Sequence, residues 1–214
     1  METPFIIDSF AALPVGTWLQ ILDVQEDTAR EDIDKQVGTI ALLTGRTERD
    51  ILNLPLTEYS HFARKAAFLA EAPARLPRVA RTYKAGTYIL RPALDLQKIT
   101  AAQYIDFQTF APEGDKRLVE LLSIALVPEG AGYNDGSYDI EAVKDAIREY
   151  ITVAQALSLT AFFLTKYVSL IRRMRISLSR LARTEKDKER GDFLTEKLAE
   201  MEKVLDNLRS IGAG

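Results

Sequence analysis

The sequence predicts a mainly helical α+β protein, with a small β-hairpin or three-stranded sheet and a long antiparallel helical hairpin at its C-terminal end. Three observations support this class. Apolar residues recur at three- and four-residue steps over most of the chain, as in amphipathic helices. Only residues 79–96 show a strong hairpin pattern, and two long apolar seams follow residue 152. We therefore expect a helical α+β domain at 1–150 and a helical hairpin at 151–214.

Composition excludes several classes of protein. The 214 residues are 47% apolar, which is enough for a sizeable core, and the net charge of -3 provides no global attraction to nucleic acid or anionic membranes. Without cysteine the chain has no disulfide, thiol nucleophile or thiolate metal site. Residues 153–171 approach the length of a membrane span, but Lys166 near the middle argues against insertion.

The first elements follow from turn and capping signals. Residues 17–24 are rich in β-formers after a Pro-Val-Gly turn, which predicts a short strand. A helix then ends at Gly45, and Thr47 caps a short helix that runs through Leu52. Tyr and Phe at helical spacing predict another helix at 57–71, before two prolines.

The hairpin at 79–96 is expected to turn at Ala85-Gly86. Because an isolated hairpin is marginally stable in water, we expect the Trp18 segment to join it as a third strand. Thr100 begins a capping box for the next helix, and another helix is predicted at 115–126. A glycine-rich surface loop follows, and Asp139 is expected to cap a short helix.

The C-terminal third has the most regular pattern. Behind a capping box at Thr152, one apolar seam runs to Leu181, and a second occupies residues 194–208. The first helix would extend about 45 Å, more than a compact domain of this size needs, so we expect oligomer or partner contacts here. The residues expected to make them are Phe163, Tyr167, Ile171, Arg172, Arg173, Arg175, Leu198, Met201 and Leu205.

Arginines at 172–183 form a basic strip that admits three interpretations. A solvated or internally paired helix face is the ordinary explanation, because cations are favoured at helix C-terminal ends. A protein interface and a nucleic-acid site are the alternatives. Phe162 and Phe163 face two sides of one helix, which indicates core packing or an intersubunit contact.

No self-contained catalytic, cofactor or metal site can be assembled from the sequence. His61 is the single histidine and lies in a predicted helix without a nucleophile-elbow motif. Residues 134–141 lack the full spacing of an EF-hand, and the glycines at 130 and 132 lack the Lys-Ser/Thr of a phosphate loop. We expect no enzyme activity of the isolated chain and no cofactor, although a site completed by a partner stays open.

Several short motifs carry a resemblance to a known family. They are the Leu-Leu-Thr-Gly segment at 42–45 with ILNLPL at 51–56, the Gly86 hairpin, residues 99–107, residues 126–130 and the Phe162-Phe163 pair. Their order resembles tail-region proteins of tailed phages of gut Bacteroidetes, which are often encoded near the tape-measure gene like a tail assembly chaperone.

The resemblance implies a tail assembly or virion structural protein that forms homo-oligomers and contacts other phage tail or virion proteins. It would act in the host cytoplasm during assembly or within the virion, with no membrane partner. One such role is to chaperone the long helical tape-measure protein, because exposed apolar seams can bind helices by groove packing. The alternative is a nucleic-acid-binding adaptor or regulator that uses the strip at 172–183.

Overall fold

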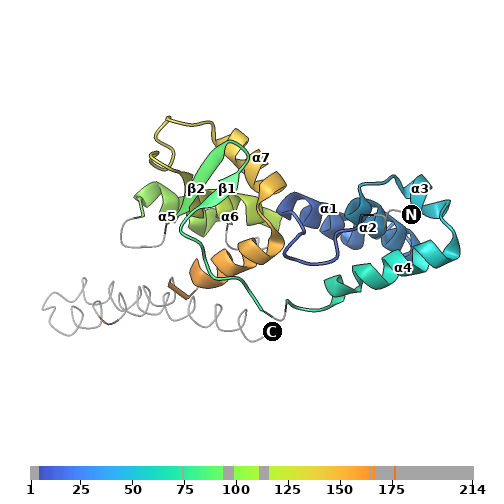
Figure 1. The fold of residues 1–214 in the computed structure, drawn as a ribbon. Helices are drawn as coiled ribbons and strands as arrows, with labels where there is room; N and C mark the ends of the chain where they lie inside the picture. The colour runs from blue at the N-terminus through green and yellow to red at the C-terminus, as the bar shows by residue number, and fades with distance from the viewer. Residues whose placement is uncertain are drawn as a thin grey trace, which may run out of the picture. The chain divides into compact units, whose positions relative to one another are not determined.

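The structure, a computed structural model of the 214-residue chain, describes residues 5–73, 75–93, 99–110, 116–163, 165–166 and 176. The chain divides into two compact units, Met1–Ala93 with Ile99–Leu159 and Leu94–Lys98 with Thr160–Gly214. The first unit contains the following helices and strands, most of which are labelled in Figure 1. In chain order they are α1 (Val15–Glu26), α2 (Asp32–Thr44), α3 (Glu48–Leu52), α4 (Leu56–Ala66), the 3-10 helix η1 (Ala67–Ala70), β1 (Tyr83–Ala85), β2 (Tyr88–Pro92), α5 (Ala101–Phe110), α6 (Leu118–Ala125), β3 (Leu126–Pro128) and α7 (Ile140–Tyr150).

The fold class predicted from the sequence is confirmed, since helices dominate and one small antiparallel sheet is present. Residues 153–163 are also helical. Most of the predicted helical hairpin at 151–214 lies outside the described residues. Among those described, no helix is both long enough and apolar enough to cross a membrane.

Helix α1 corrects the strand predicted at 17–24. Val15 and Ile21 are buried, and Trp18 packs edge-on against Phe10 with ring centroids 6.0 Å apart. The apolar side chains of this segment therefore follow helical spacing. Its many β-forming residues led instead to the prediction of a strand. β-propensity spans only about 1 kcal/mol per residue, so burial of one helical face against the core overrides it.

The predicted ends of α2 and α3 are confirmed. Gly45 follows α2 in the left-handed region, with φ 67° and its N–H donating to the carbonyl of Ala41, so a glycine suits this position. Thr47 forms a capping box with Asp50: the Asp50 N–H donates to Thr47 Oγ1 at 3.2 Å, and the Thr47 N–H donates to Asp50 Oδ2 at 3.1 Å.

Two clusters of buried apolar residues lie among the described residues of α1 to α4 and their neighbours. One joins α2, α3 and α4, and Phe62 at its centre is fully buried. The other joins the N-terminal segment and α1 to α2 and to helical residue Val153, around buried Leu13, Ile21 and Leu43. The helix predicted at 57–71 differs in one respect, because α4 ends at Ala66 and continues as the 3-10 turn η1.

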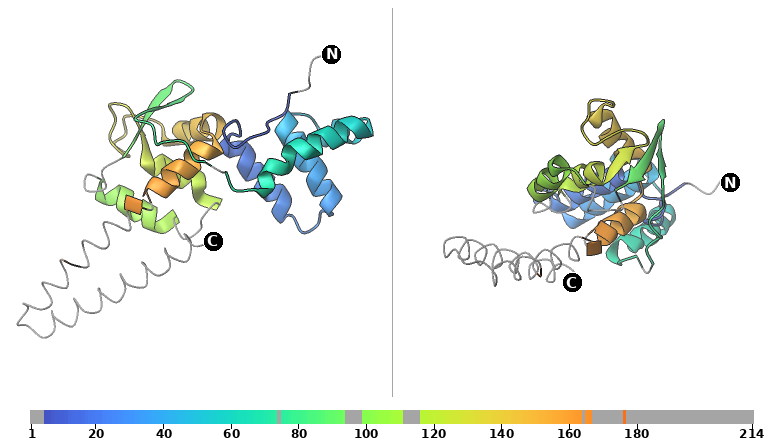
Figure 2. Two further views of the ribbon diagram at one scale, coloured as in Figure 1. Left: turned by 60° about the horizontal axis from the view of Figure 1, so that its bottom comes forward. Right: turned by 90° about the vertical axis from the view of Figure 1, so that its left-hand side faces the viewer.

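The sheet has the order β1-β2-β3 and is antiparallel throughout. Ala85 pairs with Tyr88, so the turn residues are Gly86 and Thr87, one position beyond the predicted turn. Gly86 has φ 57° and Thr87 has no positive φ, which fits a type II′ turn with glycine first. The hairpin lies next to α7 (Figure 2). A Cβ on Gly86 would be 3.1 Å from Tyr150 Cε2.

The third strand is β3, so the prediction that the Trp18 segment would join the sheet is wrong. Leu90 of β2 pairs with Pro128, and Pro92 pairs with Leu126. β3 begins directly after α6, so one short change of direction brings it to β2. The helix predicted at 115–126 accordingly ends one residue earlier, at Ala125, and Leu126 enters the sheet.

Three further capping predictions are confirmed. Asp139 accepts from the N–H groups of Glu141 and Ala142 at the start of α7. Thr100 and Thr152 each form a capping box with the glutamine three residues later. The helix that starts after Thr152 is tied to the N-terminal segment, because the Val153 N–H donates to the carbonyl of Leu13 at 2.8 Å.

Candidate interaction surfaces

The interaction residues predicted from the sequence lie almost entirely beyond the described part of the chain. Of the nine, only Phe163 is described; it lies in the helical residues 153–163 and is 9% exposed. Its ring lies edge-on to Phe162 with centroids 5.5 Å apart, and Lys166 Nζ lies 5.4 Å from the Phe162 ring centroid. The contacts expected of the other eight remain predictions. They are Tyr167, Ile171, Arg172, Arg173, Arg175, Leu198, Met201 and Leu205.

His61 lies on α4 next to Phe62, with the two ring centroids 6.0 Å apart. No hydrogen bond joins its ring to a serine or acid within the described ranges. Those ranges also hold no group of three His, Cys, Asp or Glu residues that could bind a metal ion.

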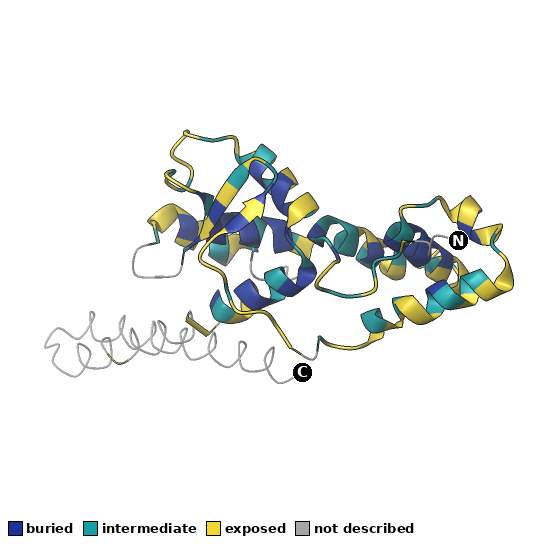
Figure 3. Ribbon diagram, viewed as in Figure 1, coloured by how far each residue is buried: buried dark blue, intermediate teal, exposed yellow. Residues whose placement is uncertain are grey.

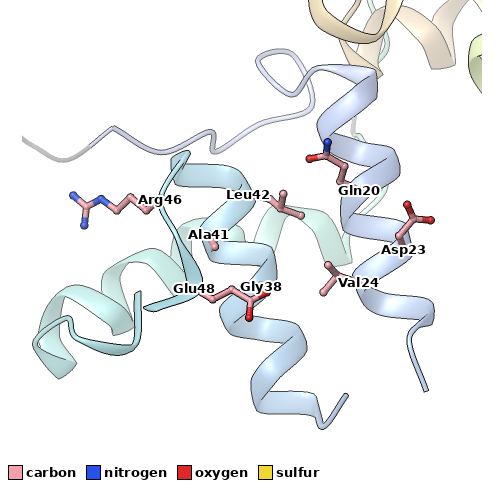
Figure 4. A pocket seen from close by; sticks show the side chains of 8 residues that line it. All are labelled: Gln20, Asp23, Val24, Gly38, Ala41, Leu42, Arg46 and Glu48. Atoms are coloured by element: carbon pink, nitrogen blue, oxygen red, sulfur yellow. The ribbon is translucent and has the colours of Figure 1, made fainter. Parts of the chain in front are cut away.

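A groove of about 400 Å³ lies between α1 and α2. Figure 4 shows Val24 of α1 and Leu42 of α2 within it, while the guanidinium of Arg46 points away from the other lining side chains. The remaining lining residues are Gln20, Asp23, Gly38, Ala41 and Glu48. Two of its charged groups already have partners, since Arg46 pairs with Glu58 at 3.4 Å and Glu48 pairs with Arg30 at 2.7 Å. Two of the three charged side chains in the lining are therefore engaged within the protein.

Glu48, which lines this groove, belongs to a small ion-pair network. Arg30 Nη1 donates to Glu48 Oε1 at 2.7 Å, and its Nε donates to Asp27 Oδ2 at 3.3 Å. Hydrogen bonding and charge attraction, first from Glu48 and then from Asp27, raise the pKa of Arg30. A Cβ on Gly38 would lie 3.0 Å from Arg30 Nη1, so glycine leaves room for the network to cross α2. The groove is therefore best explained by helix packing.

Two strongly exposed leucines lie where α3 meets α4, a part of the chain that is largely exposed in Figure 3. Leu52 is 67% exposed and Leu56 is 78% exposed, and we call this pair the leucine tip. Ile51, immediately before Leu52, is 1% exposed and anchors α3 in the core. Isolated surface leucines are normal, but two within five residues at the ends of anchored helices form a potential contact surface.

A second apolar pair lies on α5, where Ile105 is 60% exposed and Tyr104 is 42% exposed. Gln103, the preceding residue, is buried and fixes α5 to α6. Its Nε2 donates to the Ile124 carbonyl at 2.9 Å, and its Oε1 accepts from the Thr100 N–H at 3.0 Å. One glutamine thus completes a helix cap and also satisfies a carbonyl in the last turn of α6.

The loop at 130–138 is organised by Asp135. Its carboxylate accepts from the Gly132 N–H at 2.6 Å and from the Ser137 N–H at 2.9 Å, and it also bonds the Ser137 hydroxyl. These hydrogen bonds, with Ser137 the largest contributor, lower the pKa of Asp135. Tyr133 Oη donates to Asp106 Oδ2 at 2.7 Å and so ties the loop to α5, and burial raises the Tyr133 pKa. Internal turn bonds thus account for the acidic loop.

Neither exposed pair was among the interaction residues predicted from the sequence, although a local signal exists for one of them. In the segment ILNLPL, Ile51 and Leu54 belong to the core side, which leaves Leu52 and Leu56 without a place in it. Comparison with protein-family models, curated proteins and solved structures finds no match.

Proposed function

We propose that this chain is a phage tail assembly or virion structural protein that acts through contacts with itself and with other tail proteins. The leucine tip, with Leu52 and Leu56 both more than two-thirds exposed, is the observation that carries the proposal. The segment that contains it is also one of those that resemble the phage tail-region proteins. We further propose that the isolated chain is not an enzyme.

The tip suits a helical partner. Two leucine side chains at the adjoining ends of α3 and α4 can insert between the residues of an amphipathic helix, as in groove-type recognition. Burial of one leucine side chain stabilises a complex by about 1.5–3 kcal/mol, so the pair can contribute substantially to a contact. A tape-measure protein held before tail-tube polymerisation would offer such helices.

The experiment interrupts the gene in the phage genome with a stop codon and supplies variants in trans during infection. Without the protein, we expect heads that lack complete tails in negative-stain electron micrographs. Wild-type protein should restore tails, and Leu52→Ser combined with Leu56→Ser should not.

Ile89→Ser is the matched control, because Ile89 is 49% exposed on β2, away from the tip. It should restore tails as well as the wild type does. Normal tails in the complete absence of the protein would refute the assembly role. Full complementation by the double leucine variant would refute the leucine tip as the contact surface.

A further inference from the structure

Four cations spaced three residues apart form a basic strip before and within β1. They are Arg75, Arg78, Arg81 and Lys84, and all four are exposed. None of them forms an ion pair with another described residue. Ordinary surface cations in this protein often have partners, as Lys65 has in Asp8 at 2.7 Å and Lys144 has in Glu141 at 2.7 Å. The strip is therefore a concentration of uncompensated positive charge on a chain whose net charge is -3.

The backbone of the strip is held in place although residues 76–80 belong to no helix or strand. The Ser158 hydroxyl donates to the carbonyl of Pro77, and the Ala80 N–H donates to Tyr83 Oη at 3.0 Å. Two prolines, Pro73 and Pro77, further restrict the segment. A partner would therefore meet exposed cations on a backbone that is already held, and binding would cost little of the entropy of ordering a loop.

A cluster of exposed acidic residues, which we call the acidic ridge, lies at the start of α2 and has the opposite charge to the basic strip. Glu31, Asp32 and Asp34 are exposed, and none forms an ion pair with a described residue. Ile33 in the middle of the ridge is 54% exposed, and Leu76 in the strip is 36% exposed. Each surface thus combines charges of one sign with an exposed apolar side chain, the combination found in contact patches with a polar rim.

We propose that the basic strip of one molecule binds the acidic ridge of a second copy. The inference deepens the proposed function, on which it rests, by naming a partner and the two surfaces involved. Because strip and ridge are different surfaces, the contact is head-to-tail. Repetition of such a contact closes a ring or extends a filament, the two arrangements that serve assembly around a tail.

Nucleic acid fits the strip less well than a second copy does. The overall charge of -3 repels a polyanion at long range, whereas the ridge supplies matched acids at short range. Single-stranded nucleic acid also favours aromatic stacking platforms, and the tyrosine nearest the cations, Tyr83, is only 5% exposed.

The test measures the mass of the purified full chain by analytical ultracentrifugation and exchanges the charges of the two surfaces. One variant carries Arg75→Glu and Arg78→Glu; the other carries Glu31→Lys and Asp34→Lys. Each alone should lose at least about tenfold in self-association, because like charges then face each other. An equimolar mixture of the two should recover association, since the exchanged strip again meets a complementary exchanged ridge.

Arg49→Glu combined with Arg64→Glu is the control for net charge, because both residues are exposed and lie outside the strip. It should associate as the wild type does. Wild-type association should also weaken when salt rises from about 50 mM to about 500 mM, since the screening length falls severalfold. If circular dichroism shows that the ridge variant does not fold, the strip variant and the salt series are sufficient to test the proposed contact.

Unchanged self-association in the strip variant overturns the inference, as does a wild type that is monomeric at low salt. Fluorescence anisotropy with a labelled single-stranded oligonucleotide tests the alternative partner, nucleic acid. Binding that the strip variant loses would assign the strip to nucleic acid and overturn the second-copy contact. The phage complementation is an independent test. If tails fail to form without the protein but the strip variant still self-associates, the proposed function stands and the strip–ridge interface is refuted.

Discussion

Gln103 offers the sharpest test of how α5 is fixed to the protein, through the substitution Gln103→Glu. The side chain is only 6% exposed; its Nε2 donates to the Ile124 carbonyl at 2.9 Å and its Oε1 accepts from the Thr100 N–H. Glutamate has nearly the same shape and keeps the acceptor. However, an ionised carboxylate cannot donate, so one oxygen would face the Ile124 carbonyl oxygen.

The expected cost at pH 7 is about 3 kcal/mol. Loss of the donor leaves a buried carbonyl unsatisfied, which costs about 1–3 kcal/mol, and repulsion and desolvation of the carboxylate add about 1–2 kcal/mol. Burial and the facing carbonyl raise the pKa of the introduced carboxyl above its unfolded value. A raised carboxyl pKa means that the folded state binds the proton more tightly, so stability relative to wild type is highest at low pH and falls as pH rises through that pKa.

Urea denaturation of both proteins at pH 7 and at about pH 4.5 measures this dependence. We expect the deficit to shrink to about 1 kcal/mol at the lower pH, where a protonated carboxyl can donate to Ile124. Gln103→Met is the control, since it also loses the bond but cannot titrate, and its deficit should not vary with pH. A deficit in the glutamate variant that is equal at both pH values would refute the reasoning.

Three further predictions concern a helix cap, an ion pair and a β-turn. Thr47→Ala should lower the free energy of unfolding by about 1 kcal/mol in thermal denaturation, because it removes the acceptor for the Asp50 N–H; no change would show that this cap contributes nothing. Lys65→Met should move the NMR titration midpoint of Asp8 upward, because hydrogen bonding and charge from Lys65 lower the pKa of Asp8 in the folded protein. That lowered pKa makes the pair stabilising above the unfolded carboxyl pKa and ineffective as pH falls through the folded one, so an unmoved midpoint would refute the pairing in solution. Gly86→Ala should cost about 1–2 kcal/mol in urea denaturation, since φ is 57° and the added Cβ would approach Tyr150; an unchanged midpoint would contradict the observed turn geometry.

The parts of the fold that could be predicted from the sequence are those governed by residues three or four positions apart. Thr47, Thr100 and Thr152 each meet a partner three residues later, and Gly45 and Asp139 act within one helical turn. Such signals require no knowledge of the rest of the chain. Element ends were consequently predicted to within a few residues for α2, α3, α5 and α7.

The wrong predictions concern elements whose structure depends on packing or pairing with segments distant in the sequence. Residues 17–24 contain enough β-formers to suggest a strand, yet Ile21 and Trp18 pack as one helical face against segments from elsewhere in the chain. The third strand, Leu126–Pro128, is three residues long and ends in proline, so its own sequence gives almost no strand signal. Its place in the sheet follows from its position directly after α6. The residue pattern of the three-residue segment carries no information about that position.

The candidate surfaces were harder to predict than the fold for a related reason. A periodic pattern indicates which side chains a helix can bury, but an exposed side chain is recognised only when its neighbours' burial is known. Leu52 and Leu56 are exposed because Ile51 and Leu54 occupy the available core space. Likewise, the arginines at 75, 78 and 81 stand out only once the ion pairs of the other cations are assigned.

The leucine tip and the basic strip share one physical property that suits the proposed assembly role. Each presents its side chains from a backbone that is already fixed: the capping box at Thr47 and buried Ile51 hold α3, and Ser158 holds the strip at Pro77. A fixed contact loses little conformational entropy on binding, so modest buried area or a few ion pairs can produce measurable affinity. Affinity from modest contacts is reversible, as the proposed assembly role requires if subunits are to be placed and then released. Because the tip is apolar and the strip is charged, salt should weaken the strip contact while sparing the tip, so the two interactions can be separated in one purified protein.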